Sequence, residues 1–445
     1  MNLPMQEALS VPAMQAELLA AVEAQRDALI DATRSLVAAA SPNPPGDVSL
    51  AAAAAETLLR GIRGALVSRY ETAPGIVNLV ARIDSGRPGR RLVFNGHLDT
   101  FPIGENLGWT VPPLGGVVKD GRLYGRGVSD MKAGIAASIM AASVLALRPD
   151  SWRGEIVITL AGDEESMGVR GTQWLLDNVE AARGDAMVSG DVGSPLVVRF
   201  GEKGLFWIEV SATGKAAHGA HVHKGVNAID RLRAALDAVQ RLEQLPVAAP
   251  AEIAAAVALA APVSEPMSGA GESQVLQRVT VNIGTIDGGV SPNLVPTEAR
   301  AQGDIRLPVG VSTQQVVDRL DEWLGPMEGV QWRVVQRYEP SYTPPDHELV
   351  QRALVASARV TGGAPVANMR VGASDARLYR AAGVPTIVLG CTPHGMGAAD
   401  EHVDVHELVN VAKIHTLVAY GYLSGTQTQT HTQTQTQTQT QTQTP

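Results

Sequence analysis

Segments with the pattern of β-strands alternate with segments with the pattern of α-helices along most of the chain, and this alternation constrains the fold most. Apolar runs at residues 91–95, 155–161 and 185–189 have the length of buried strands, and residues 131–147 and 171–178 have helical patterns between them. Such alternation predicts an α/β fold with a largely parallel sheet covered by helices. Ligand sites in these sheets lie at the carboxyl ends of the strands.

The pattern changes near Phe200. A new series follows: a strand at 205–211, a helix at 227–242, strands at 277–286 and 298–306, a helix at 313–324 and a strand at 330–337. The order β-α-β-β-α-β is that of a ferredoxin-like unit. We therefore expect one α/β domain made of residues 1–199 and 341–424, with a second domain, residues 200–340, inserted into it. Residues 425–445 alternate Thr and Gln and cannot bury a core, so we expect a disordered tail.

Further helices and strands are expected on either side of these segments. The expected helices are residues 16–40, 48–67, 347–361, 375–382 and 405–422, and the expected strands are residues 78–83 and 385–390. We expect substrate specificity to depend on loops of the inserted domain such as residues 249–274.

Composition excludes several classes of protein. The net charge is −9 and Lys and Arg do not cluster, so no nucleic-acid partner is expected. The N-terminus lacks a secretory signal pattern, and no apolar run appears long enough to span a bilayer, which favours a cytoplasmic protein with no membrane partner. Cys391 is the only cysteine, so any metal must be held by His, Asp or Glu rather than by a thiolate cluster.

Three consecutive carboxylates, Asp163, Glu164 and Glu165, directly follow the apolar run at residues 155–161. Ionised carboxylates repel one another, and the end of a buried strand solvates them poorly. A positive group is therefore expected beside them, and a solvated acidic turn is the alternative.

Other candidate ligands lie near the ends of expected strands or in adjoining loops. His97 and Asp99 are two residues apart, which directs both side chains to one face of an extended chain, and a carboxylate often orients a metal-binding His. Asp130 lies at the start of a helix, where it could cap the helix or bridge two cations. Asp191 and His402 complete the set. A structural His and a helix-capping Asp are the alternatives.

These residues and their order resemble the M20 family of metallopeptidases and amidohydrolases over about residues 15–422. The similarity rests on the motifs GHLDT, GRGVSDMKAG, GDEES, GKAAHGAHVHKGVNAI and GGVSPNLVP, on a later DIR, and on a C-terminal His. The resemblance implies two divalent metal ions, Zn²⁺ or else Co²⁺ or Mn²⁺, which suit an all N and O ligand set. The implied ligands are His97 and Asp191 for one ion, Glu165 and His402 for the other, and Asp130 as the bridge.

The resemblance also implies roles for residues that do not bind metal. Glu164 is expected to be the general base and Asp99 to orient His97. The inserted domain is expected to be a lid that also forms a homodimer. His218 would then reach the active site of the second subunit and stabilise the developing oxyanion.

Asn293 and Arg306 match positions that contact the substrate in the family. Arg can bind a carboxylate through two nitrogens, although Arg306 could instead pair with Asp304. His221 and His223 are bystanders or substrate contacts.

Two positions depart from the family pattern or leave a choice. Many relatives have Glu where this chain has Asp191, which could change the preferred metal. The C-terminal segment offers His394, His402 and His406, and we select His402 because Glu407 follows it at a spacing seen in relatives.

The resemblance implies a dinuclear metal-dependent hydrolase that cleaves an amide C–N bond in a small, carboxylate-bearing substrate. An N-acyl amino acid deacylase is favoured. The alternatives are a metallo-carboxypeptidase or dipeptidase, a catabolic aminohydrolase that acts on an unusual amine, and an inactive binding protein with a hydrolase fold.

Overall fold

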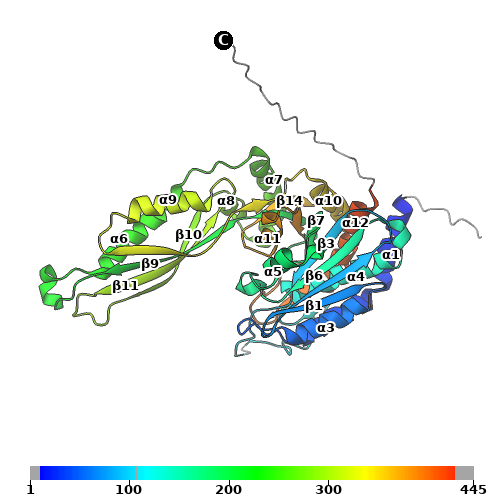
Figure 1. The fold of residues 1–445 in the computed structure, drawn as a ribbon, viewed down its shortest axis with the longest axis horizontal. Coiled ribbons are helices and arrows are strands. Elements are labelled where there is room, and N and C mark those ends of the chain that lie inside the picture. The colour runs from blue at the N-terminus through cyan, green and yellow to red at the C-terminus, as the bar shows by residue number, and fades with distance from the viewer. Residues whose placement is uncertain (1–10, 106–107, 426–445) are drawn as a thin grey trace, which may run out of the picture.

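The computed structural model describes residues 11–105 and 108–425, so the tail expected at residues 425–445 lies outside it except for its first residue. Figure 1 shows a compact lobe that contains the N-terminal and C-terminal helices, and an elongated lobe built from the middle of the chain. The compact lobe is mixed α/β and the elongated lobe has its own antiparallel sheet. This arrangement confirms the expected fold class.

The compact lobe is built around a nine-stranded sheet in the order β1-β2-β6-β3-β7-β15-β8-β13, with β14 paired to β8. The strands are β1 (Leu66–Ala73), β2 (Ile76–Asp84), β3 (Arg91–His97), β6 (Glu155–Ala161), β7 (Ala186–Ser189), β8 (Val197–Glu202), β13 (Ser341–Tyr342), β14 (Val366–Arg370) and β15 (Thr386–Val388). The centre is parallel, because β3 pairs in parallel with β6 and β7, and β7 with β15. The carboxyl ends of these strands therefore meet at one edge of the sheet.

Helices cover both faces of this sheet. One face packs against α1 (Val11–Ala24), α2 (Arg26–Ala38), α3 (Ser49–Arg60), α4 (Ala133–Ala146), α10 (Glu348–Thr361) and α12 (Val405–Ser424), and the other against α5 (Thr172–Asn178) and α11 (Ala376–Ala381). Alternate residues of the central strands belong to the two cores, with Ile156 and Ile158 on one side and Val157 on the other. Every residue of β6 is buried, as expected for a strand covered on both faces.

One buried segment has the length and composition of a membrane span. The segment Val128–Ala146 consists of a helical turn, η1 (Val128–Lys132), and α4. The expectation that no apolar run is long enough to span a bilayer is wrong for this segment. However, 89% of it is buried inside the protein, where α4 packs against α12 as a core helix.

The elongated lobe has the expected ferredoxin-like topology. Its sheet has the order β10-β11-β9-β12, and all neighbouring strands are antiparallel. The elements are β9 (Gly204–Thr213), α6 (Ala228–Gln240), β10 (Thr280–Gly288), β11 (Glu298–Leu307), α9 (Thr313–Leu324) and β12 (Val330–Tyr338). Alternate residues of β11 are buried, because one face of this sheet packs against α6 and α9 (Figure 1).

Residues 249–274 are not the loop that the sequence analysis expects. They form α7 (Ala251–Ser268) and the start of α8 (Glu272–Leu276), and α7 packs against β14 of the compact lobe. A buried ion pair fixes this segment, since Arg199 Nη1 of β8 lies 3.0 Å from Glu272 Oε1. Pro262 and Pro266 lie inside α7, which made a helix hard to predict from the sequence.

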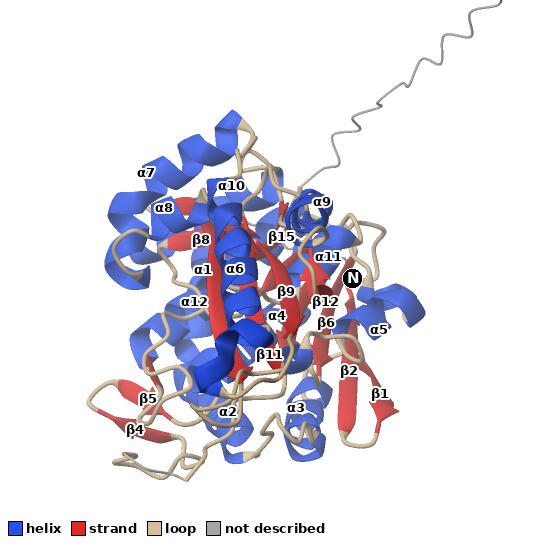
Figure 2. Ribbon diagram, turned by 90° about the vertical axis from the view of Figure 1, so that its left-hand side faces the viewer, coloured by secondary structure: helices blue, strands red, loops and turns tan. Residues whose placement is uncertain are grey.

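Several other boundaries also differ from expectation. The helix expected at residues 16–40 is divided at Gln25, whose ψ of 19° is not helical, into α1 and α2. The helix expected at residues 48–67 ends at Arg60, because Gly61 and the left-handed Gly64 terminate it before β1 begins. A small sheet that the sequence did not predict contains β4 (Val117–Lys119), β5 (Arg122–Tyr124) and β16 (His402–Asp404), and Figure 2 shows β4 and β5 below the main sheet.

Candidate metal centre

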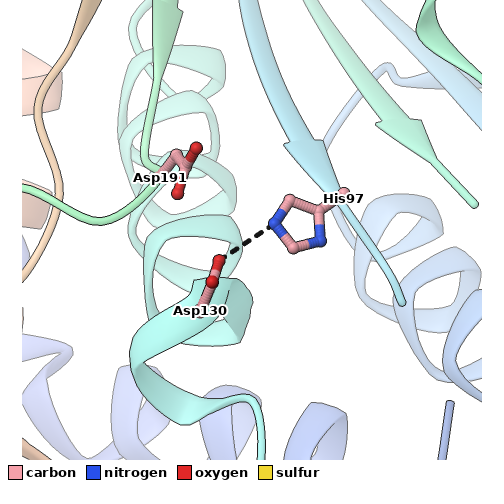
Figure 3. A group of neighbouring side chains, drawn as sticks. All are labelled: His97, Asp130 and Asp191. Atoms are coloured by element: carbon pink, nitrogen blue, oxygen red, sulfur yellow. Dashed lines mark hydrogen bonds and ion pairs between the residues drawn. The ribbon is translucent and has the colours of Figure 1, made fainter. Parts of the chain in front are cut away.

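His97, Asp130 and Asp191 come together at the carboxyl edge of the central sheet (Figure 3). His97 is the last residue of β3, Asp191 lies two residues beyond β7, and Asp130 lies in the turn before α4. One ligand atom from each residue lies within 4.8 Å of the other two, and His97 Nε2 is 3.0 Å from Asp130 Oδ1. An imidazole and two carboxylates at this spacing suit a divalent cation.

Asp99 connects this group to the loop that carries Glu164 and Glu165. His97 Nδ1 lies 2.9 Å from the backbone carbonyl of Asp99 and 3.4 Å from its carboxylate. The same carboxylate accepts hydrogen bonds from the backbone N–H groups of Glu164 at 3.2 Å and Glu165 at 3.0 Å, and from Asn43 at 2.9 Å. The fully buried Asp99 therefore fixes both the imidazole and the acidic loop.

The acidic loop lies in an environment that disfavours negative charge. Burial raises the pKa of Glu164 well above its ordinary value, and the charge of His97 offsets this only in part. Burial also raises the pKa of Glu165 to about 8, and the neighbouring Asp130 and Asp191 add to the shift. Glu165 Oε1 is buried and has no hydrogen-bond partner among the described residues. A cation here would neutralise these carboxylates and engage that oxygen.

Two arginines that the sequence analysis did not identify also reach this group. Arg370 Nη1 donates to Asp191 Oδ2 at 2.7 Å. Burial alone would raise the pKa of Asp191, but the charge and hydrogen bond of Arg370 hold it below the ordinary value. Arg377 Nη1 lies 3.9 Å from Glu164 Oε1. Arg370 ends β14, a strand missing from the sequence analysis, so its position at this edge could not be inferred.

His402 is outside the tight group of His97, Asp130 and Asp191, although the residue before it, Glu401, contacts the loop that carries Asp130. It begins β16, its Nδ1 lies 2.8 Å from the carbonyl of Asp400, and its ring stacks on that of His394 with centroids 4.9 Å apart. The described residues thus bring together three of the five expected ligands, whereas Glu165 and His402 do not join a group this close.

Glu401, next to His402, supports the loop that carries Asp130. Its carboxylate accepts hydrogen bonds from Arg126 Nη1 at 2.7 Å and from the backbone N–H and hydroxyl of Ser129, both at 3.0 Å. The sequence analysis gave this residue no role, although it lies in a strongly acidic stretch beside a candidate ligand.

Two of the expected residues of the inserted segment, His218 and Asn293, lie at its tip, whereas Arg306 pairs with Leu205 at its base. β9 leaves the compact lobe at Gly204, and the exposed His218 follows its other end, Thr213. Asn293 lies at the same tip, where its carbonyl accepts a hydrogen bond from the N–H of Gly219 at 2.7 Å. Arg306 Nε donates to Asp304 at 2.9 Å, which is the alternative pairing that the sequence analysis raised.

The fold and the donor set together define a class of protein. An α/β sheet that presents an imidazole and several crowded carboxylates at its carboxyl edge can hold a divalent metal ion that activates water, which is the chemistry of a metal-dependent hydrolase.

Comparison with known proteins agrees with this class. Residues 93–420 match the model of peptidase family M20/M25/M40, and the chain belongs to this family. The succinyl-diaminopimelate desuccinylase of Parvibaculum lavamentivorans is 30% identical over 375 residues, which cover 80% of this chain and 85% of the relative.

Two solved structures share the fold. An M20 family metallo-carboxypeptidase from Sulfolobus solfataricus has a TM-score of 0.73 at 16% identity, over 88% of this chain and 99% of the other. A dinuclear metal binding peptidase of the M20 family from Bacillus subtilis has a TM-score of 0.64 at 14% identity, over 90% and 99% of the two chains.

Proposed function

We propose that this protein is a deacylase that hydrolyses the amide bond of an N-acyl amino acid. The observation that carries the proposal is the cluster of His97, Asp130 and Asp191 beside the half-buried Glu164. The similarity to a desuccinylase, whose name describes removal of an acyl group, supports this substrate class over others. A carboxypeptidase or dipeptidase is the second candidate, favoured by the shared fold with a metallo-carboxypeptidase.

We further propose that the site holds two divalent ions, of which Zn²⁺ suits the donors best and Co²⁺ or Mn²⁺ are substitutes. The proposed ligands are His97 and Asp191 for one ion, Glu165 and His402 for the other, and Asp130 between them. The orphaned Oε1 of Glu165 supports its part in this set, because a buried carboxylate oxygen needs a cation or a donor. When bound, the ions would polarise the scissile carbonyl and lower the pKa of the attacking water.

Glu164 is the proposed general base. Its raised pKa favours acceptance of a proton from the attacking water and later delivery of that proton to the leaving amine. Arg377 lies beside Glu164 and does not contact Asp191, so we propose that it binds the substrate carboxylate. Arg306 is a weaker candidate for this role, because Asp304 already occupies its Nε.

The role of His218 depends on a homodimer. Within one chain it lies at the far end of the elongated lobe, so we propose that it acts in the site of a second copy, where it would stabilise the developing oxyanion. Asn293 shares that tip and would approach the same substrate. The cytoplasmic location also remains a prediction.

A substrate panel tests the proposal. Hydrolysis of N-succinyl, N-acetyl and dipeptide substrates is measured by amine release with Zn²⁺, Co²⁺ or Mn²⁺. We expect turnover of at least one N-acyl amino acid at ten times or more the rate for any dipeptide. Turnover of dipeptides alone would favour the second candidate, and no turnover of any amide would contradict both.

A further inference from the structure

A cavity of about 600 Å³ lies between the two lobes, on the side of α9 and α11. One wall is formed by the first turn of α9 and by the end of β12 with the residues that follow it, and the other wall is α11 of the compact lobe. Because the walls belong to different lobes, the width of the cavity depends on how the lobes are placed relative to each other.

The side chains that line this cavity offer more hydrogen-bond donors than acceptors. Arg337, Arg377 and Arg380 line it, and Glu339 is its single acid. The carboxylate of Glu339 already accepts hydrogen bonds from the backbone N–H of Thr313 at 3.2 and 3.0 Å and from its hydroxyl. Arg337 is exposed and forms no side-chain hydrogen bond or ion pair with residues 11–105 or 108–425.

The two buried arginines carry unused donors. The side chain of Arg380 is only 3% exposed, and its Nη1 lies 3.5 Å from Glu202 Oε1, which is too long for a hydrogen bond. Apart from this ion pair with Glu202, neither Nη atom of Arg380 has a hydrogen-bond partner among the described residues, and Nε of Arg377 also lacks one. Buried donors without partners are unfavourable, and the planar guanidinium matches the oxygens of a carboxylate, sulfate or phosphate.

Arg377 also links this cavity to the catalytic group. Its guanidinium lies 4.4 Å from the centre of the Tyr338 ring, and its Nη1 is 3.9 Å from Glu164 Oε1. Arg377 therefore lies both at the wall of the cavity and beside the carboxylate of Glu164.

We propose that this cavity binds a small oxyanion, separately from the metal centre. The oxyanion is a free ion that acts as an effector or a carboxylate at the far end of a long acyl group. The existence of the site does not depend on the substrate proposed above, because its first test requires no turnover.

Sulfate is the probe for that first test. Thermal melting of the metal-loaded protein is followed over a sulfate titration, with sodium chloride at equal ionic strength as the reference. Sulfate stabilises most proteins by exclusion from their surface, without saturation, so only a saturable rise in melting temperature reports a site.

The informative variant is Arg337→Gln and its matched control is Arg333→Gln. Both residues lie on β12 and both changes remove one charge, but Arg333 pairs with Glu209 at 2.9 Å and does not line the cavity. We expect a saturable rise in melting temperature in the wild type and in Arg333→Gln, at similar sulfate concentrations. In Arg337→Gln the sulfate concentration at the midpoint of the rise should be about tenfold higher, because one charge-assisted contact is lost. No saturable rise in the wild type, or equal midpoints in all three proteins, would overturn the proposal.

Kinetics then distinguish the two sources of the anion. In one case, Arg337→Gln raises KM for an N-succinyl substrate but not for its N-acetyl analogue, and sulfate competes with the N-succinyl substrate. The cavity then holds a substrate carboxylate. If both KM values are unchanged and sulfate changes kcat in the wild type but not in Arg337→Gln, the site takes a free ion. An effect of sulfate on turnover that is the same in both proteins would overturn the assignment of that effect to this cavity.

Discussion

The buried pair of Arg126 and Glu401 gives the sharpest test of how the Asp130 loop is held. Their side chains are 4% and 1% exposed, the charged atoms are 2.7 Å apart, and the second oxygen of Glu401 binds Ser129, the neighbour of Asp130. Burial raises the pKa of Glu401, which means that Arg126 and Ser129 do not fully offset its loss of water.

Replacement of Glu401 by Ala would leave Arg126 buried with an unpaired charge. Removal of one partner from a buried pair typically costs about 3–5 kcal/mol of unfolding free energy. The control is the pair of Arg319 and Glu322, which has a similar separation of 2.6 Å but side chains that are 50% and 57% exposed. Glu322→Ala should cost less than about 1 kcal/mol, because water screens an exposed pair.

Both variants are unfolded with urea at pH 7 after treatment with a chelator, so that metal binding does not contribute to the midpoint. Glu401→Ala should also bind metal more weakly on reloading, since the loop beside Asp130 loses its support. Equal losses of stability in the two variants would refute the claim that burial, rather than distance, determines how much the Arg126–Glu401 pair contributes to the free energy of unfolding.

Three further predictions follow from single contacts. Asp99→Ala should weaken metal binding about 10–100-fold by calorimetry, because Asp99 holds both His97 and the acidic loop, and unchanged affinity would contradict that role. Burial lowers the pKa of His415 from 6.5 to about 4, so the unfolded chain binds more protons between these pH values and stability should fall by up to about 3 kcal/mol as pH decreases across the window. His415→Gln should flatten this pH dependence of the free energy of unfolding, measured with urea. An unchanged dependence on pH would mean that other groups cause it. If His218 acts across a dimer, mixing His218→Ala with Glu164→Ala subunits should restore up to about a quarter of wild-type activity, whereas a monomer would restore none.

The central part of the fold could be predicted because its signals are local. The runs that form β3, β6 and β7 are short, apolar and separated by helical patterns, so their order and their common edge followed from general rules for α/β sheets. The strand and helix order of the elongated lobe was equally visible, and the observed pairing of β10, β11, β9 and β12 confirms it.

The segments that were missed depend on distant contacts. α7 contains two prolines and is stabilised by packing on β14 and by the pair of Arg199 and Glu272, neither of which a local pattern reveals. β8 and β14 are strands whose partners lie more than 150 positions apart in the chain, as the pairing of Val197 with Val366 shows. Arg370 and Arg377 reach the site only through that pairing and the turn after it.

The candidate site was predicted as a set rather than in detail. His97, Asp130 and Asp191 meet as expected, because each follows or precedes an element that ends at the same edge. The supporting role of Glu401 and the tie between Asp99 and the N–H groups of Glu164 and Glu165 could not be foreseen, since they depend on loop conformation.

The most direct test of the central claim is metal content and turnover measured together in the wild type and in Glu164→Gln. The substitution keeps the size of the side chain and removes only its capacity to take a proton. We predict that both proteins retain the same metal content by mass spectrometry and that kcat falls by a factor of about 10²–10⁴ in the variant. A wild-type protein that binds no divalent metal, or a variant that turns over at the wild-type rate, would contradict the account.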